Sequence, residues 1–95
     1  MGPELENAIA EIERTIGMLR RDSADRWADD LERWLADVRS TSSFGQRQAL
    51  LRIGECCHPK ALGDVAVSDP AWHSQLDRLH DTCAKAFNRL EKDAG

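Results

Sequence analysis

Residues 4–21, ELENAIAEIERTIGMLRR, place apolar side chains at alternating steps of four and three residues. This spacing puts them on one face of an α-helix of about five turns. Pro3 suits the first helical position, because its missing N–H would be unpaired there, and Arg20 and Arg21 suit the negative end of the helix dipole. Gly17 marks either a close approach by another helix or a tolerated defect. We therefore expect a first helix over 4–21, with its stripe formed by Leu5, Ile9, Ile12, Ile16 and Leu19.

A second amphipathic pattern covers residues 23–39, and Asp22 or Ser23 is the expected cap. Its opposite face alternates in charge at a spacing of four residues, which is typical of an exposed helix surface with ion pairs. The expected pairs are Arg26 with Asp30, Asp29 with Arg33, and Arg33 with Asp37. The apolar stripe consists of Trp27, Leu31, Trp34 and Val38, widened by Ala28 and Leu35.

Two further helices are expected after a polar break at residues 40–43, whose last members can cap the third helix. The third covers about 44–55, and the fourth covers about 70–92, with Asp69 as a capping residue and Pro70 in the first helical position. The fourth helix carries a stripe of Trp72, Leu76, Leu79, Cys83, Phe87 and Leu90. Between these two helices lies a stretch of about a dozen residues in which apolar residues follow no regular spacing, and connections of that length are often functional.

These patterns predict an all-α fold, a small antiparallel four-helix bundle with a long loop between the third and fourth helices. The chain has 95 residues, which fits a single helical domain over 1–95 and excludes a multidomain enzyme.

The net charge of −4 is concentrated in the first part of the chain, because residues 1–39 hold ten acidic and six basic residues. Such a surface repels phosphate, so we expect no nucleic-acid partner, and it would attract a basic protein. No run of 18 apolar residues and no signal sequence is visible, and three cysteines without an export signal favour reduced thiols. The expected location is the cytoplasm, without membrane contact.

Two clusters contain residue types that bind metals. Cys56, Cys57 and His58 stand together, with His80 and Cys83 further along, but adjacent ligands strain a zinc chelate and no Cys-x-x-Cys pair occurs. Packing of the thiols in the core or under the loop is the alternative interpretation. A second row, formed by His73, Asp77 and His80, could bind a metal or form an exposed polar flank. We expect no metal site and no cofactor.

The histidines belong to no recognisable serine or cysteine signature, and no phosphate-binding glycine loop is present, so we expect no enzyme. Three tryptophans in a short chain can fill the core or form an interface with another protein. Trp34, beside Leu35 on a wide apolar stripe, is the best interface candidate.

From Trp27 onward the sequence resembles a family of small bacterial helical proteins of unknown function associated with polymorphic-toxin loci. The resemblance rests on residues 27–38 (WADDLERWLADV), residues 50–54 (LLRIG), residues 62–65 (LGDV) and a final helix with Trp72, Leu76 and Leu79. Two features depart from the family pattern. Gly63 stands where members have Asn, and residues 56–59 (CCHP) replace a glycine-rich turn.

The resemblance implies an immunity-type protein that binds a cognate toxin and occludes its active site. An acidic inhibitor associates faster with a basic cleft, so the expected contact residues are Asp25, Asp29, Asp30, Glu32, Trp34 and Asp64. Two other functions remain open. The chain could be a structural module that forms a homodimer through the stripe of the second helix, or a metal or redox sensor that uses Cys56, Cys57 and His58.

Overall fold

The computed structural model describes residues 2–94, which fold into four α-helices and one 3₁₀-helix. The elements are α1 (Pro3–Arg21), α2 (Asp25–Val38), α3 (Ser43–Cys56), η1 (Leu62–Asp64) and α4 (Trp72–Ala94). No strand occurs among residues 2–94. The prediction of an all-α protein with four α-helices is confirmed.

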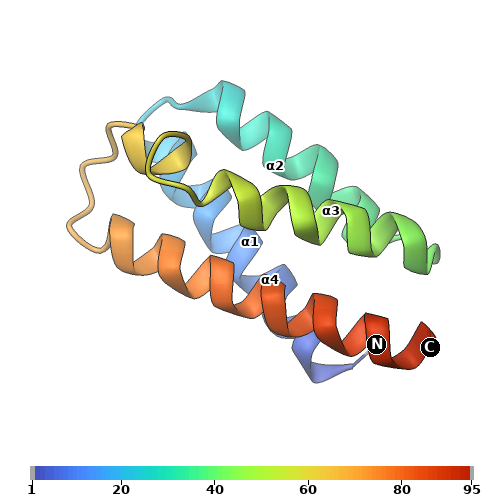
Figure 1. The fold of residues 1–95 in the computed structure, drawn as a ribbon. Coiled ribbons are helices and arrows are strands. Elements are labelled where there is room, and N and C mark those ends of the chain that lie inside the picture. Colours follow the sequence, from blue (N-terminus) through green and yellow to red (C-terminus); the bar gives the residue numbers. More distant parts are fainter. Residues whose placement is uncertain (1, 95) are drawn as a thin grey trace.

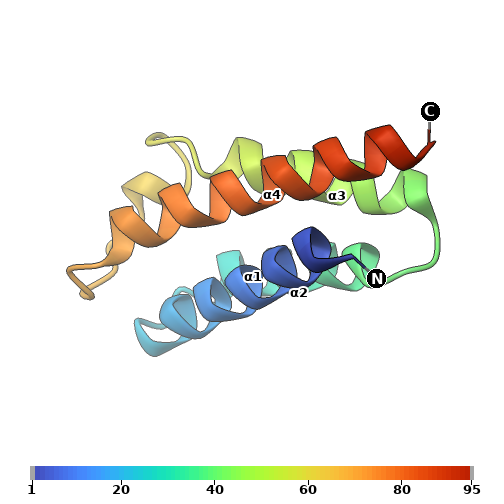
Figure 2. The ribbon, with the colours of Figure 1, turned by 90° about the horizontal axis from the view of Figure 1, so that it is seen from below.

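The helices form two layers, with α1 beside α2 in one and α3 beside α4 in the other (Figures 1 and 2). Helix α1 packs against α2 and α4, and α3 packs against the same two helices. Helices α1 and α3 therefore occupy opposite corners of the cross-section. The molecule is elongated along the helices, with principal extents of 41 × 21 × 20 Å.

All four helices contribute to one hydrophobic core, as their amphipathic stripes require. The stripe expected for α1 lies in this core, with Ile9 partly buried and the other members buried. In α2 the aliphatic members of the expected stripe are buried, whereas Trp27 and Trp34 are only partly buried, at the edge of the core. The buried residues of α2 are Ala28, Leu31, Leu35 and Val38.

One polar contact joins α4 to α1 inside this core. Gln75 is buried, and its Nε2 donates hydrogen bonds to Glu11 Oε1 at 2.9 Å and to Thr15 Oγ1 at 3.3 Å. Thr15 is fully buried, and its hydroxyl also donates to the Glu11 carbonyl oxygen at 2.8 Å. Because buried amide groups are costly when unpaired, this contact fixes how α4 sits on α1.

Helix α2 begins at Asp25, two residues later than the pattern suggested. Ser23 has a φ of 60°, in the left-handed region, so the chain turns there instead of starting the helix. The residue before the helix is Ala24, which makes no side-chain capping bond. The expected cap Asp22 instead accepts hydrogen bonds from Ser68, at 3.1 Å from the backbone N and 2.9 Å from Oγ.

The starts of α3 and α4 show two local caps. Ser42 Oγ accepts a hydrogen bond from the Gly45 backbone N at 3.1 Å, so a serine of the polar break caps α3 as expected. Asp69 Oδ1 accepts one from the Ala71 backbone N at 2.8 Å, but the first α-helical residue is Trp72. The predicted start at residue 70 is a turn that leads into the helix.

The connection from residue 57 to residue 71 is held in place at two residues, Leu62 and Ser68. Leu62, in η1, is fully buried, and its carbonyl oxygen accepts a hydrogen bond from Trp72 Nε1 at 3.1 Å. Since Ser68 is held by Asp22, the connection is tied to α4 at one point and to the α1–α2 turn at another.

Candidate protein-binding site

The turn between α1 and α2 brings a basic residue of one helix against the acidic flank of the next. Asp25, Asp29 and Glu32 follow one another at spacings of four and three, so they share one side of α2. Arg20 lies in the last turn of α1 and forms ion pairs with all three. We call these four residues the acidic cluster.

A single guanidinium group connects the three carboxylates of the acidic cluster. Arg20 Nη1 lies 3.4 Å from Asp25 Oδ1, and Nη2 lies 2.9 Å from both Asp29 Oδ1 and Glu32 Oε2. The hydrogen bond to Asp29, together with that to Glu32, raises the pKa of Arg20 above its ordinary value. The side chains of the three acids stay 53–67% exposed. Three carboxylates against one guanidinium leave a formal charge of −2 on this surface.

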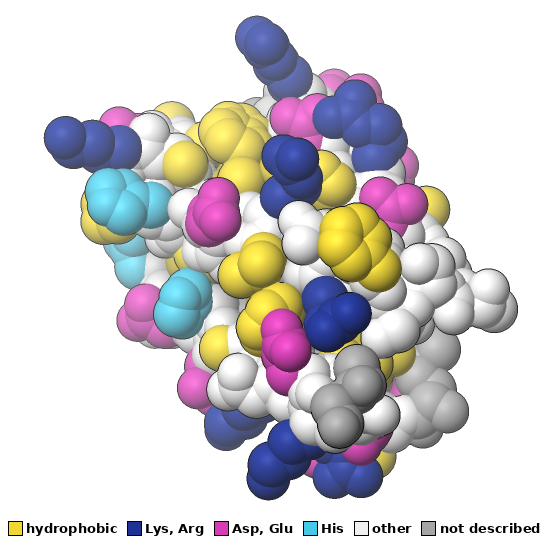
Figure 3. Space-filling model, turned by 45° about the vertical axis from the view of Figure 1, so that its right-hand side comes forward, with side chains coloured by type: hydrophobic (Ala, Val, Ile, Leu, Met, Phe, Trp, Pro, Cys, Tyr) yellow, Lys and Arg dark blue, Asp and Glu magenta, His cyan; other side chains and the backbone are white. Residues whose placement is uncertain are grey.

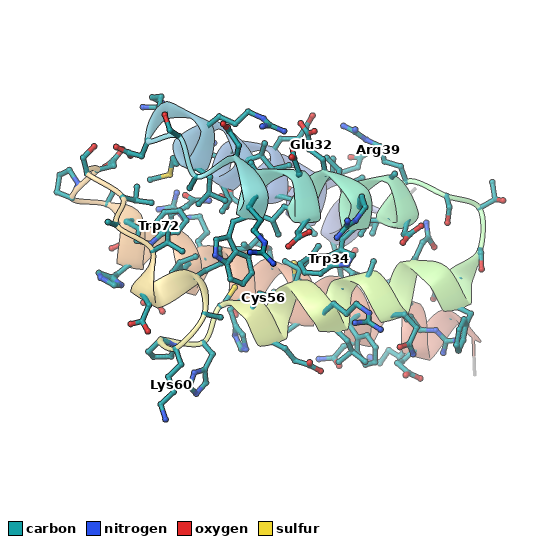
Figure 4. The ribbon with its side chains drawn as sticks, turned by 90° about the horizontal axis from the view of Figure 1, so that it is seen from above. Glu32, Trp34, Arg39, Cys56, Lys60 and Trp72 are labelled. Carbon is teal, nitrogen blue, oxygen red and sulfur yellow. The ribbon has the colours of Figure 1, made fainter. Side chains whose placement is uncertain are left out.

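A groove runs between α1 and α2 beside the acidic cluster, with a volume of about 470 Å³. Ile16 and Leu35 give it an apolar floor, and the absence of a side chain at Gly17 widens it. Arg20 and Glu32 line it together with the pair Arg39–Glu13, which is 2.8 Å apart. Figure 4 shows Glu32 and Arg39 along the same side of α2. The acidic cluster therefore lies at the edge of a groove between α1 and α2.

Asp30 and Trp34 lie on the other flank of α2, toward α3. Asp30 pairs with Arg33, and its side chain is only 30% exposed. Trp34 is partly buried against the core, on the side of α2 that faces α3 (Figure 4). Among the predicted contact residues, the structure thus brings Asp25, Asp29 and Glu32 together and separates Asp30 and Trp34 from them.

Asp64 lies in η1, where its side chain is exposed. Its element packs against α4, and the hydrogen bonds and ion pairs found within residues 2–94 do not join it to the acidic cluster. Asp64 therefore belongs to the 57–71 connection and is not bonded to the acidic cluster.

The expected ion pairs along α2 are replaced by pairs that the turn makes possible. Asp29 binds Arg20 instead of Arg33, and Arg33 binds Asp30, three residues before it. From the sequence, Arg20 was expected only to suit the negative end of the first helix's dipole. Its partners follow it by five to twelve residues in the chain, and ion pairs within one helix are spaced three or four residues apart. A short helix-to-helix turn between a basic end and an acidic flank was the available signal.

Sequence patterns also missed two exposed apolar residues on α3. Phe44 is 67% exposed and Leu51 is 41% exposed. The signal was present, because a helix with Leu50, Leu51 and Ile53 within four positions cannot turn all three toward one core.

The cysteines sit in apolar surroundings. Burial raises the pKa of the Cys57 and Cys83 thiols from 9.0 to about 12, and it also raises that of Cys56. At neutral pH these groups are protonated thiols, the less reactive form. His73, Asp77 and His80 are exposed along α4, and within residues 2–94 no three potential ligands gather as a metal site would require.

The comparisons with known proteins found no matching family model, no matching curated protein and no matching solved structure. None of the helices described by the structure has the length and apolar character needed to cross a lipid bilayer.

Proposed function

We propose that this chain is an immunity-type protein, which binds a cognate bacterial toxin and blocks its active site with the acidic cluster. The proposal takes the helices as an antiparallel bundle that acts in the cytoplasm and carries its long 57–71 connection beside the binding face. The toxin is expected to have a basic active-site cleft. The observation that carries the proposal is the residual charge of −2 on three exposed carboxylates held by one guanidinium group.

Two physical features support binding to a basic protein. Charges of one sign on an exposed surface accelerate encounter with an oppositely charged cleft, and they do so without a conformational change when the side chains are already positioned. The groove beside the cluster can contact the aliphatic part of a partner's lysine or arginine side chain through Ile16 and Leu35. Its charged lining is balanced, so the attraction for the charged end comes from the exposed carboxylates of Asp25 and Asp29.

The test is co-expression of the chain with the product of the neighbouring gene, with cell survival as the readout. We expect the wild-type chain to protect the cells. The combined change Asp25→Asn, Asp29→Asn and Glu32→Gln should abolish protection and slow association of the purified proteins by at least about tenfold at low salt, because long-range attraction is lost.

A matched control neutralises three exposed acids elsewhere, with Glu6→Gln, Asp81→Asn and Asp93→Asn. This variant has the same net charge as the cluster variant and should still protect. The proposal fails if the neighbouring product is harmless alone, if it is equally lethal with and without the chain, or if both triple variants behave alike.

A further inference from the structure

The α3–α4 face carries apolar surface that nothing in the described chain covers. Phe44 and Leu51 are the large hydrophobic side chains exposed among residues 2–94, and their spacing of seven places them on one side of α3. Figure 3 shows hydrophobic side chains gathered on this side of the molecule, between charged ones. Exposed apolar patches of this kind commonly mark interaction sites.

A small apolar pocket lies on the same face, between α3 and α4. Its volume is about 240 Å³, and its lining includes Leu51, Gly54, Ala84 and Phe87. Gly54 leaves the pocket open, because a Cβ atom built there would meet only the His80 side chain, at 4.0 Å. The face therefore combines an exposed aromatic ring with a pocket for an apolar group.

We propose that a second copy of this chain covers the α3–α4 face, and that Phe44 of each copy enters the Gly54 pocket of the other. Phe44 and Gly54 are ten residues apart on one helix, which corresponds to about 15 Å along its axis. A two-fold axis that lies in the interface, over α3 at the level of Ala49, brings Phe44 of each copy to the level of Gly54 of the other, so both pockets are filled at once. Such reciprocal contacts are typical of two-fold dimers.

The charges on α3 are complementary under the same two-fold axis. It brings Glu55 of one copy to the level of Ser43 of the other, so the exposed Glu55 carboxylate lies near the positive N-terminal end of the other copy's α3. That first turn contains no acidic residue that would repel it. Arg47 meets Leu51 of the other copy, and its charge is already paired with Glu91, at 3.4 Å.

The α3–α4 face is of the size that a dimer interface needs. A long side of the molecule measures about 41 × 20 Å in outline, or about 800 Å², and each partner contributes an area of this order to an interface of standard size. A face made of α3 and α4 also leaves the acidic cluster between α1 and α2 free. The dimer and the proposed toxin contact can therefore coexist.

The experiment is measurement of molar mass by sedimentation equilibrium and light scattering, at chain concentrations up to about 1 mM. The wild-type chain should have twice its mass of 10.7 kDa. Phe44→Glu and Leu51→Glu should each give a single-chain mass with an unchanged helical circular dichroism spectrum. Ala10→Glu adds the same charge at an exposed position of α1 and should leave the dimer intact. A wild-type mass of one chain at every concentration overturns the proposal.

A second variant separates loss of the interface from loss of folding. Gly54→Ala adds a methyl group inside the pocket and improves helix propensity, so it should raise the unfolding temperature of the dilute monomer while weakening the dimer at least tenfold. An unchanged dimer dissociation constant contradicts the proposed contact.

The two proposals can also fail separately. Phe44→Glu should still protect against the toxin, since it leaves the acidic cluster unaltered. If this variant loses protection and the wild-type chain is monomeric, the α3–α4 face binds the toxin and the proposal of a second copy is wrong.

Discussion

Gly17 shows how one residue in a helix can be judged only from its surroundings. The sequence left two explanations for it, a close approach by another helix or a tolerated defect. A Cβ atom built at Gly17 would have no atom within 4 Å, so no neighbouring helix requires the glycine. It remains a residue that loses more backbone entropy on folding than alanine does.

We therefore predict that Gly17→Ala stabilises the protein by about 0.5–1 kcal/mol, measured as the free energy of unfolding in urea. The control is Gly63→Ala, where the new Cβ would lie 3.3 Å from the His58 carbonyl oxygen and no comparable gain is expected. Destabilisation by Gly17→Ala would mean that the groove between α1 and α2 is narrower than described.

Local sequence rules succeeded where a residue and its partner are close in the chain. Ser42 caps α3 through a residue three positions away, as the sequence predicted. Asp22 was expected to act in the same way, but its partner Ser68 is 46 residues distant. Arg20 likewise binds acids across a turn. Contacts of this range depend on how the helices pack, so the acids of the candidate site could be predicted and the cation that gathers them could not.

At the level of the helix, periodicity predicted all four elements but misjudged which residues of α2 are deepest. Leu31 and Val38 of the expected stripe are buried, but Trp27 and Trp34 are only partly buried, and the neighbouring Ala28 and Leu35 are deeper. Because α2 packs between α1 and α3, aliphatic side chains fill its centre, and the large indoles fill the margin. Hydrophobic spacing alone does not distinguish these two faces.

The connection before α4 depends on one indole group. Trp72 is buried, and its N–H group donates to the carbonyl oxygen of the fully buried Leu62. We predict that Trp72→Phe lowers the free energy of unfolding by about 1–2 kcal/mol, because it removes the indole hydrogen bond and leaves a space beside the carbonyl, which keeps only its bond from the Val65 backbone N. Urea titration followed by circular dichroism provides the measurement.

Trp34→Phe is the control for this change, because Trp34 is only partly buried and belongs to α2. It should cost clearly less than Trp72→Phe. Equal losses at the two positions would show that indole volume, and not the bond to Leu62, determines the stability of the connection.

For the whole molecule, the buried thiols predict how stability depends on alkaline pH. The pKa of Cys57 and Cys83 is about 12 in the folded chain, against an ordinary value of 9.0. Between these values the unfolded chain loses protons that the folded chain keeps, so the free energy of unfolding falls as pH rises. Below pH 9 this contribution is fully present.

The measurement is the urea midpoint from about pH 8 to about pH 11. Cys83→Ala should reduce the slope of stability against pH by at most about 1.4 kcal/mol per pH unit, even though it lowers stability at every pH. Cys57→Ser should reduce the slope in the same direction. Slopes equal to that of the wild-type chain would contradict the burial of these thiols.

The buried amide of Gln75 also limits how the two helix layers can fit together. A slide of α4 along α1 by one helical turn would move the amide about 5.4 Å from Glu11 and Thr15 and strand its N–H groups among hydrocarbon. Leucine and isoleucine side chains would tolerate such a shift far better, since their attraction has no direction. A single glutamine thus selects one register of α4 on α1 among several that hydrophobic contacts alone would allow.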